Sequence, residues 1–245
     1  MDTLIYPDWP APENIKAIST TRIGGFSLPP YDALNIAAHV DDSLDTVNKN
    51  REHLYKAADL PESPRWLSQT HETCVLNSHD WQPDIQADAM ISTSVNHVCT
   101  IMTADCLPIL LCTQQGNTVA AIHAGWRGLA AGIIEQTINK FNHSPPHIMA
   151  WLGPAIGSTQ FEVGKDVYQI FTHNDPKAEQ AFQQTDSSHY LANIYSLAKQ
   201  RLNKLGITAI YGGDYCTVTD EQQFFSYRRD GITGRMASMI WIVDK

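Results

Sequence analysis

Residues 98–128 read VCTIMTADCLPILLCTQQGNTVAAIHAGWRG, and this stretch decides the fold of the chain. An apolar run, Val98–Met102, stops at a polar corner, and a second apolar run continues over Leu107–Cys112. A turn at Gln114–Asn117 then leads into a third apolar run that ends at His123. Apolar runs of this length around a Gly/Asn turn are typical of a β-hairpin.

The predicted hairpin brings a thiol and an imidazole to one end. If Thr113 faces Thr118 across the turn, Cys106 falls opposite Gly125, with His123 two residues away at the same end. A helical pattern begins directly afterwards, and a junction of strands with a helix is a common place for a site. We therefore expect Cys106 and His123 to be neighbours in a site, although a buried cysteine also serves simply as a small hydrophobe.

Composition and charge narrow the class of protein. The chain has 245 residues, of which 43% are hydrophobic, and we expect residues 1–245 to form one globular domain. Its formal net charge of -9 argues against nucleic acid or an anionic membrane as partner, because those bind basic surfaces. A local basic pocket remains compatible with this charge, and no partner protein is predicted.

The cysteines and the amino-terminal residues predict a cytoplasmic protein. The five cysteines are odd in number and show no CxxC spacing, which favours reduced thiols over a disulfide framework. The first residues lack the basic and apolar regions of a signal peptide, and no apolar run approaches the roughly 20 residues needed to span a bilayer.

Four other segments bear on the site. We expect a short strand over Trp66–His71 that ends at the histidine, and another over Gln86–Ile91 in which Asp88 is a buried polar residue bonded to a nearby loop. Apolar spacing predicts one helix over Leu129–Phe141. The C-terminal segment Phe224–Val243 has the pattern of a hairpin.

Arginines next to turns are candidates for binding an anion. Arg22 precedes two glycines in a segment that is either an anion-binding loop or a plain turn. Arg127 stands at a predicted helix start, where it either faces a phosphate or packs on Trp126. Three more arginines flank the predicted C-terminal turn, which forms either a solvated edge or an anion-binding edge: Arg228, Arg229 and Arg235.

Thiolate and imidazole are donors that Zn²⁺ prefers, and a catalytic zinc has three protein ligands and one open position. Cys106 and His123 supply two ligands from the hairpin, and His71, at the end of a different predicted strand, is our choice for the third. The segment His39–Asp42 also contains potential ligands, but its position before a helical pattern favours an N-cap cluster.

Other metal schemes fit less well. The 10 histidines include no HxH pair, whereas coupled copper centres need many paired imidazoles. The HxE and PCxxC motifs of zinc-dependent cytidine deaminases do not occur. A single zinc with three ligands is the simplest scheme, and copper also suits these donors.

Six blocks of sequence resemble the YfiH-type laccase-domain family, whose members are also called polyphenol oxidases or purine nucleoside phosphorylases. The blocks are spread over essentially the whole chain: TTRIGGFS (20–27), QTH (69–71), TADCLP (103–108), HAGWRG (123–128), LGPAIG (152–157) and FSYRRD (225–230).

The resemblance implies an α+β fold with β-sandwich-like mixed sheets flanked by helices. It implies a zinc held by His71, Cys106 and His123. It also implies phosphorolysis of adenosine, inosine and methylthioadenosine to the base and a ribose 1-phosphate, with some adenosine deaminase activity. The sequence departs from the family pattern at Glu72, Ala37 and Asp41, where glycines are usual, and Glu72 raises a question about the shape of the pocket mouth.

The leading hypothesis is a zinc-dependent purine nucleoside phosphorylase that takes a purine nucleoside and phosphate. In this hypothesis Cys106 acts as part of the metal centre, Arg127 and Arg22 neutralise the phosphate, and Asp105 and Gln69 orient ligands or substrate.

Two alternatives remain open. One is a cysteine hydrolase acting on an amide-type substrate, with Cys106 as nucleophile and His123 or His71 as base. The other is a metal-binding scaffold module, which would need a fourth protein ligand to close the zinc site.

Overall fold

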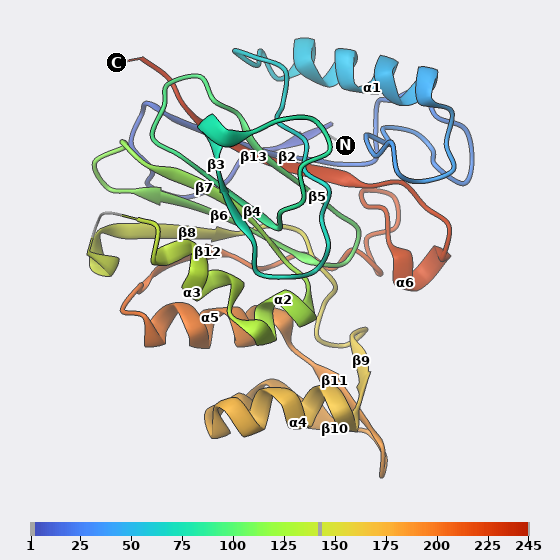
Figure 1. Cartoon of the computed structure of the whole chain (residues 1–245). Coiled ribbons are helices and arrows are strands. Elements are labelled where there is room, and N and C mark those ends of the chain that lie inside the picture. Colours follow the sequence, from blue (N-terminus) through green and yellow to red (C-terminus); the bar gives the residue numbers. More distant parts are fainter. Residues whose placement is uncertain (1–2, 142–143, 245) are drawn as a thin grey trace.

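The computed structural model describes residues 3–141 and 144–244, and its core is a pair of facing β-sheets (Figure 1). The first sheet has four antiparallel strands in the order β1 (Leu4–Ile5), β2 (Ile15–Thr20), β13 (Met236–Ile242) and β5 (Cys99–Thr103). The second sheet has six strands in the order β12 (Ala209–Gly212), β8 (Ile148–Leu152), β6 (Leu107–Thr113), β7 (Val119–Ala124), β4 (Ala89–Ser92) and β3 (Val75–Asn77). Its two outermost strand pairs are parallel and the others are antiparallel, so the sheet is mixed.

Alternation of side chains along β6 explains why the sheets stack. Leu110 and Cys112 point into a cluster shared with Ile101 and Ile240 of the four-stranded sheet. The intervening residue Leu111 points the other way, into a second cluster. A strand that is apolar on both faces must be covered on both faces, because successive side chains lie on opposite sides of a sheet.

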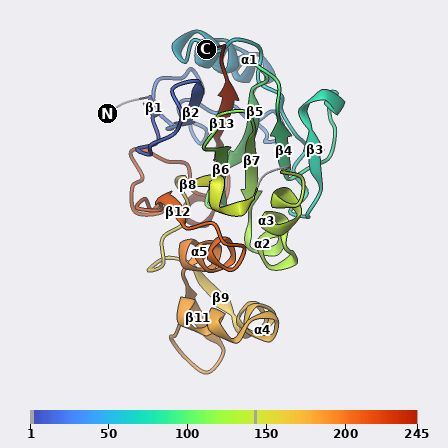
Figure 2. The ribbon, with the colours of Figure 1, turned by 90° about the vertical axis from the view of Figure 1, so that its left-hand side faces the viewer.

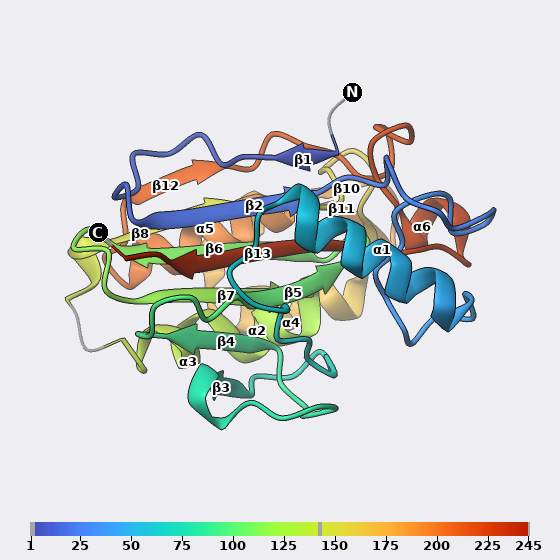
Figure 3. The ribbon, with the colours of Figure 1, turned by 90° about the horizontal axis from the view of Figure 1, so that it is seen from above.

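Helices cover the two outer faces of the sandwich (Figures 1 and 3). Helix α1 (Leu44–Ala57) lies against the four-stranded sheet, and α2 (Trp126–Ala131), α3 (Ile133–Ile138) and α5 (Ile194–Lys204) lie against the six-stranded one. The expected α+β arrangement of sandwich-like mixed sheets flanked by helices is therefore confirmed.

A small three-stranded sheet stands at one end of the molecule, beyond α5 (Figure 2). It contains β10 (Phe182–Gln184), β11 (His189–Ala192) and β9 (Glu162–Gly164), and α4 (Lys165–Asn174) packs beside it. The remaining elements are short: η1 (Ser78–Asp80), η2 (Pro145–His147), η3 (Pro176–Ala181) and α6 (Tyr227–Asp230). No helix among the described residues is long and apolar enough to cross a membrane.

The hairpin predicted from residues 98–128 is confirmed with its register. Strands β6 and β7 pair from Leu107 with Ala124 to Cys112 with Val119, and the Thr113 N–H bonds to the Thr118 carbonyl. Strand β5, before the polar corner, belongs to the other sheet. The corner at residues 104–106 is thus the place where the chain crosses from one sheet to the other.

Three local predictions were wrong. Trp66–His71 forms no strand: isolated bridges occur at Arg65 and Ser68, and His71 lies in a turn with φ 63°. The helix predicted over Leu129–Phe141 is interrupted at Gly132, whose φ of 98° breaks it into α2 and α3.

The third error is the C-terminal hairpin. Its first arm is not a strand but the short helix α6, which begins where the Ser226 side chain accepts a hydrogen bond from the Arg229 N–H. The second arm is β13, which pairs with β2 and β5 instead. A local helix cap and strand partners distant in sequence outweighed the hairpin pattern.

Candidate functional site

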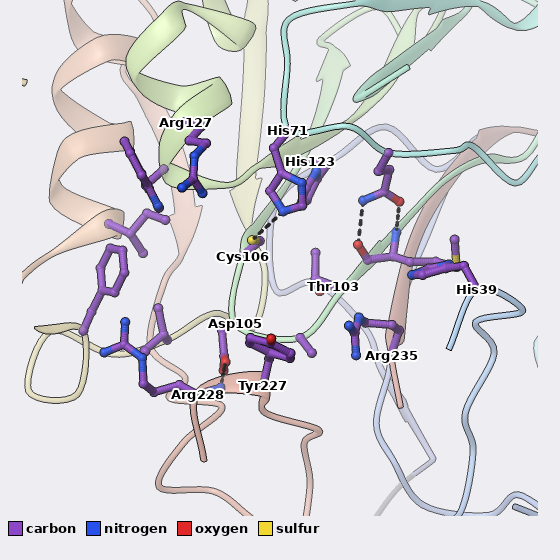
Figure 4. A pocket seen from close by; sticks show the side chains of 17 residues that line it. His39, His71, Thr103, Asp105, Cys106, His123, Arg127, Tyr227, Arg228 and Arg235 are labelled. Carbon is purple, nitrogen blue, oxygen red and sulfur yellow. Dashed lines mark hydrogen bonds between the residues drawn. The ribbon is translucent and has the colours of Figure 1, made fainter. Parts of the chain in front are cut away.

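The three predicted metal ligands meet at the wall of a cavity of about 570 Å³ (Figure 4). The donor atoms of His71, Cys106 and His123 all lie within 4.8 Å of one another. Cys106 Sγ is 3.9 Å from His71 Nε2. In the part of the chain that the structure describes, this is the one group of three or more potential metal ligands so gathered.

Each ligand comes from a different piece of backbone. Cys106 stands at the crossing between the sheets, and His123 is on β7, buried to 3% exposure. His123 pairs in register with Pro108, two residues beyond the cysteine, as the hairpin argument expected. His71 enters from the turn that precedes β3, far away in sequence.

Asp88 connects the two histidines. Its fully buried carboxylate accepts hydrogen bonds from His123 Nδ1 at 2.7 Å and from the backbone N–H groups of His71 and Glu72 at 2.9 Å. It also accepts from the backbone and hydroxyl of Thr70. The predicted contact of Asp88 with a nearby loop is confirmed, but its bond to His123 was missed. The Nδ1 contact leaves Nε2 of His123 available to a metal, an orientation that carboxylates bonded to metal-binding histidines commonly fix.

The electrostatics of the site favour the thiolate. Burial opposes ionisation of Cys106, but the charges and hydrogen bonds of His123 and His71 outweigh it and lower the pKa of the thiol. Burial also opposes protonation of His123, yet Cys106 and Asp88 raise its pKa. The deprotonated thiol is the form that binds a metal or attacks as a nucleophile.

A glycine keeps the space beside the donors open. A Cβ at Gly125 would lie 3.0 Å from His71 Cδ2, 3.1 Å from Cys106 Sγ and 3.7 Å from His123 Cε1. One sulfur and two imidazole nitrogens facing a cavity form a donor set that fits a catalytic zinc with an open position. The same set suits copper.

Two predicted substrate residues line the cavity but direct their polar atoms to the protein. The Gln69 amide exchanges two 2.7 Å hydrogen bonds with the backbone of Met102. The Asp105 carboxylate accepts from the Thr217 hydroxyl at 2.5 Å and from the Arg228 backbone N–H at 2.7 Å. Both residues therefore hold the walls of the cavity in place.

The predicted arginines divide into those inside and those outside the cavity. Arg127 lines it, with its guanidinium 4.4 Å from the Trp126 ring. Arg22 lies elsewhere, held by Asp32 through an ion pair of 3.3 Å and a backbone hydrogen bond. Glu72 is exposed and is not among the residues that line the cavity.

The C-terminal segment supplies two arginines that the sequence left undecided. Arg228 and Arg235 line the cavity, whereas Arg229 binds Asp230 and backbone carbonyls. In the sequence, the feature that pointed to Arg228 and Arg235 was the cluster of arginines around the predicted turn. His39 also lines the cavity, although its sequence context predicted only an N-cap cluster.

The fold and site define an α+β sandwich protein with a candidate mononuclear metal centre in a cavity. The family described as multi-copper polyphenol oxidoreductase laccase matches residues 16–243, and the chain belongs to this family. The predicted resemblance to YfiH-type laccase-domain proteins is thus confirmed.

Several known proteins are similar over nearly the whole chain. An Escherichia coli protein named purine nucleoside phosphorylase YfiH is 52% identical over 244 residues, covering 99% of this chain and 100% of the relative. A Haemophilus influenzae purine nucleoside phosphorylase is 50% identical, covering 97% and 98%. Among solved structures, a Neisseria meningitidis protein has a TM-score of 0.96 at 44% identity, covering 99% and 100%. A Bacillus licheniformis protein called YfiH has a TM-score of 0.86 at 29% identity, covering 93% and 92%.

Proposed function

We propose that this chain is a zinc-dependent purine nucleoside phosphorylase. It would cleave adenosine, inosine and S-methyl-5'-thioadenosine with phosphate to the base and a (methylthio)ribose 1-phosphate, with adenosine deaminase as a side activity. The observation that carries the proposal is the set of three ligands facing a cavity that also contains arginines. The names of the 52% and 50% identical relatives support the same activity.

The residues of the cavity match the needs of phosphorolysis. When held by His71, Cys106 and His123, zinc supplies Lewis acidity toward a substrate oxygen. Guanidinium groups that line the cavity would neutralise the charge of phosphate, which arginine binds with paired N–H donors. The rings of Trp126 and Phe161 offer apolar surface for a purine.

The proposal is tested by following adenosine by chromatography with and without phosphate, using protein whose metal content has been measured. Release of adenine that requires phosphate, with ribose 1-phosphate as co-product, is the expected result. Formation of inosine would measure the deaminase activity separately. If no nucleoside changes while the protein contains zinc, the phosphorylase proposal fails.

A cysteine hydrolase is the second candidate. Cys106 would be the nucleophile, His123 the base, and Asp88 the carboxylate that orients the base through its hydrogen bond to Nδ1. Alkylation with iodoacetamide separates the two. A nucleophilic thiolate would react and lose activity on amide substrates in metal-free buffer, whereas a zinc ligand is protected while the metal is bound. A single domain over residues 1–245 and a cytoplasmic location stay predictions.

A further inference from the structure

The cavity has two basic ends, one on each side of Cys106. Figure 4 shows Arg127 and Arg228 on one side of the thiol and Arg235 and His39 on the other. A nucleoside and an anion bound together need two different environments, one flat and apolar and one positively charged. Trp126 and Phe161 line the first end, whereas at the second end the Arg235 guanidinium lies 5.9 Å from the centre of the Tyr227 ring, so the first end has more aromatic surface.

At the first end the arginines lie on aromatic rings. Arg127 stacks on Trp126, and the Arg228 guanidinium lies 5.7 Å from the centre of the Phe161 ring while Nη1 donates to the Gln160 carbonyl. Both arginines are exposed to solvent, which screens their charge. The aromatic rings make this end suited to a planar base.

At the second end a guanidinium is fixed and partly removed from water. Arg235 Nη1 donates to the carbonyls of Thr233 at 2.8 Å and Gly234 at 3.0 Å, and the Arg235 backbone N–H bonds to Asn35 Oδ1. Burial lowers its pKa. In the described ranges no carboxylate forms an ion pair with Arg235. A half-buried cation with no ionic partner is costly, and a bound anion would offset that cost.

The lowered pKa of His39 indicates a positive electrostatic potential at the same end. The residue is solvent-exposed, yet partial burial of the imidazole and the charges of Arg235 and Arg51 all lower its pKa. Arg51 itself is held by the Ile36 carbonyl and stacks on Trp66. A neutral imidazole still donates one N–H, so His39 and Arg235 together present charge and donors to an oxyanion.

The Asp105 carboxylate does not cancel this potential. Asp105 and the Cys106 thiolate both act on the Arg235 guanidinium from the side of the metal ligands. The two oxygens of Asp105 are each occupied by a hydrogen bond to the protein, from Thr217 and from Arg228. These bonds come from neutral groups and leave the charge of Asp105 in place, but burial outweighs it in the pKa of Arg235, and the charges of Arg235 and Arg51 act on His39, so the end toward His39 is basic.

Building on the proposed phosphorylase activity, we propose that His39 and Arg235 form the oxyanion subsite, which binds inorganic phosphate, and that the purine occupies the Trp126 and Phe161 end. This places phosphate and base on opposite sides of the ribose. A phosphate oxygen forms a bond to C1′ as the C1′–N9 bond breaks. The base leaves with the electron pair of that bond, and the proton that hydrogen phosphate gives up ends on the base.

The test compares variants at the two ends in the zinc-loaded full chain. His39→Asn and Arg235→Met remove the proposed contacts, and Arg127→Met makes the same arginine change at the other end. The KM for phosphate at saturating adenosine should rise about tenfold to a hundredfold in the first two variants, as loss of a charge-assisted hydrogen bond predicts. Their KM for adenosine should change less than threefold. Arg127→Met should change the KM for phosphate less than threefold.

Direct binding separates failure of the subsite from failure of the proposed function. Inorganic phosphate is titrated into each protein by calorimetry, which needs no turnover. If the wild type catalyses phosphorolysis but His39→Asn and Arg235→Met bind phosphate as tightly as wild type, the subsite is overturned and the function stands. If no phosphorolysis occurs but phosphate binds and both variants lose that binding, the subsite stands without the function.

Two further outcomes are decisive. An increase in the KM for phosphate only in Arg127→Met would place the anion at the other end and overturn the proposal. If the circular dichroism melt shows that Arg235→Met does not fold, phosphate binding and the KM for phosphate of Arg235→Lys and His39→Asn are used instead to test the subsite. The lysine retains charge but loses the paired donors, so it should weaken phosphate binding less than the loss of the whole side chain, yet measurably.

Discussion

Replacing Asp88 with Asn tests whether this buried carboxylate holds the ligand set together. The substitution preserves shape but exchanges one carboxylate oxygen for an NH₂ group. If that group replaces Oδ2, it faces the backbone N–H groups of Thr70 and Glu72, which then lose their acceptor. If it replaces Oδ1, it faces His123 Nδ1 and the His71 N–H.

In the first orientation two backbone donors lose their acceptor in a fully buried place; in the second the His71 N–H does, while His123 can accept at Nδ1 by moving its proton to Nε2. At about 1–3 kcal/mol for each unsatisfied buried donor, Asp88→Asn should lower the free energy of unfolding of the metal-free protein by about 1–6 kcal/mol. Zinc affinity should fall about tenfold to a hundredfold, the usual effect of changing a residue that hydrogen-bonds to a metal ligand. That loss equals about 1.4–2.8 kcal/mol.

Zinc affinity is measured by competition with a chromogenic chelator, and stability by denaturant unfolding of the metal-free protein. The matched control is Asp175→Asn, which makes the same change at a surface ion pair with Lys204. The control should alter stability by less than about 1 kcal/mol and leave zinc affinity unchanged. If Asp88→Asn binds zinc within twofold of wild type and unfolds at the same denaturant concentration, the role given to Asp88 is wrong.

Three other predictions address the ligands, the cavity wall and pH. Gly125→Ala is compatible with the local φ of -61°, but the added methyl group would crowd His71 and Cys106. Zinc affinity, measured by competition with a chelator, should fall at least about tenfold, and the free energy of unfolding of the metal-free protein should change little. The Asn side chain of Asp105→Asn can still accept from the Arg228 N–H and donate to the Thr217 hydroxyl, whereas Asp105→Ala can do neither. The kcat should therefore stay within about threefold of wild type for Asp105→Asn and fall at least about tenfold for Asp105→Ala. Equal losses of kcat in the two variants would instead show that the negative charge is needed. Burial opposes ionisation of Glu62, but the hydrogen bonds from Arg65 and the Val98 N–H outweigh burial and lower the pKa of Glu62. Because the folded pKa lies below the unfolded one, the stabilisation is present at neutral pH and is lost as pH falls below about 4.5 through the folded value. Glu62→Gln should therefore lower the free energy of unfolding by about 1 kcal/mol at pH 7, and this loss should shrink in unfolding curves measured in acid.

The hairpin and two of its site residues could be predicted because they depend on local rules. A short turn with Gly116 sets the register of β6 and β7, and that register carries Cys106 and His123 to one end. No long-range information was needed for these two residues.

The rest of the site depends on contacts between distant segments. His71 reaches the cysteine because Asp88 holds its turn, and no periodic pattern in the sequence encodes that bond. Arg22 and Arg235 stand in similar glycine-containing segments, yet Asp32 holds the first outside the cavity while backbone carbonyls hold the second within it. Which arginine meets a carboxylate is decided only by the packing of the whole chain.

The most direct test of the account is to remove metal from the protein, add zinc in steps, and measure phosphate-dependent adenine release against bound zinc. The account predicts activity that rises in proportion to zinc and levels off at about one ion per chain, as a three-ligand catalytic site requires. Cys106→Ala should neither retain zinc nor gain activity. Full phosphorolysis by wild-type protein shown to be free of metal, or by Cys106→Ala, would contradict the central claim.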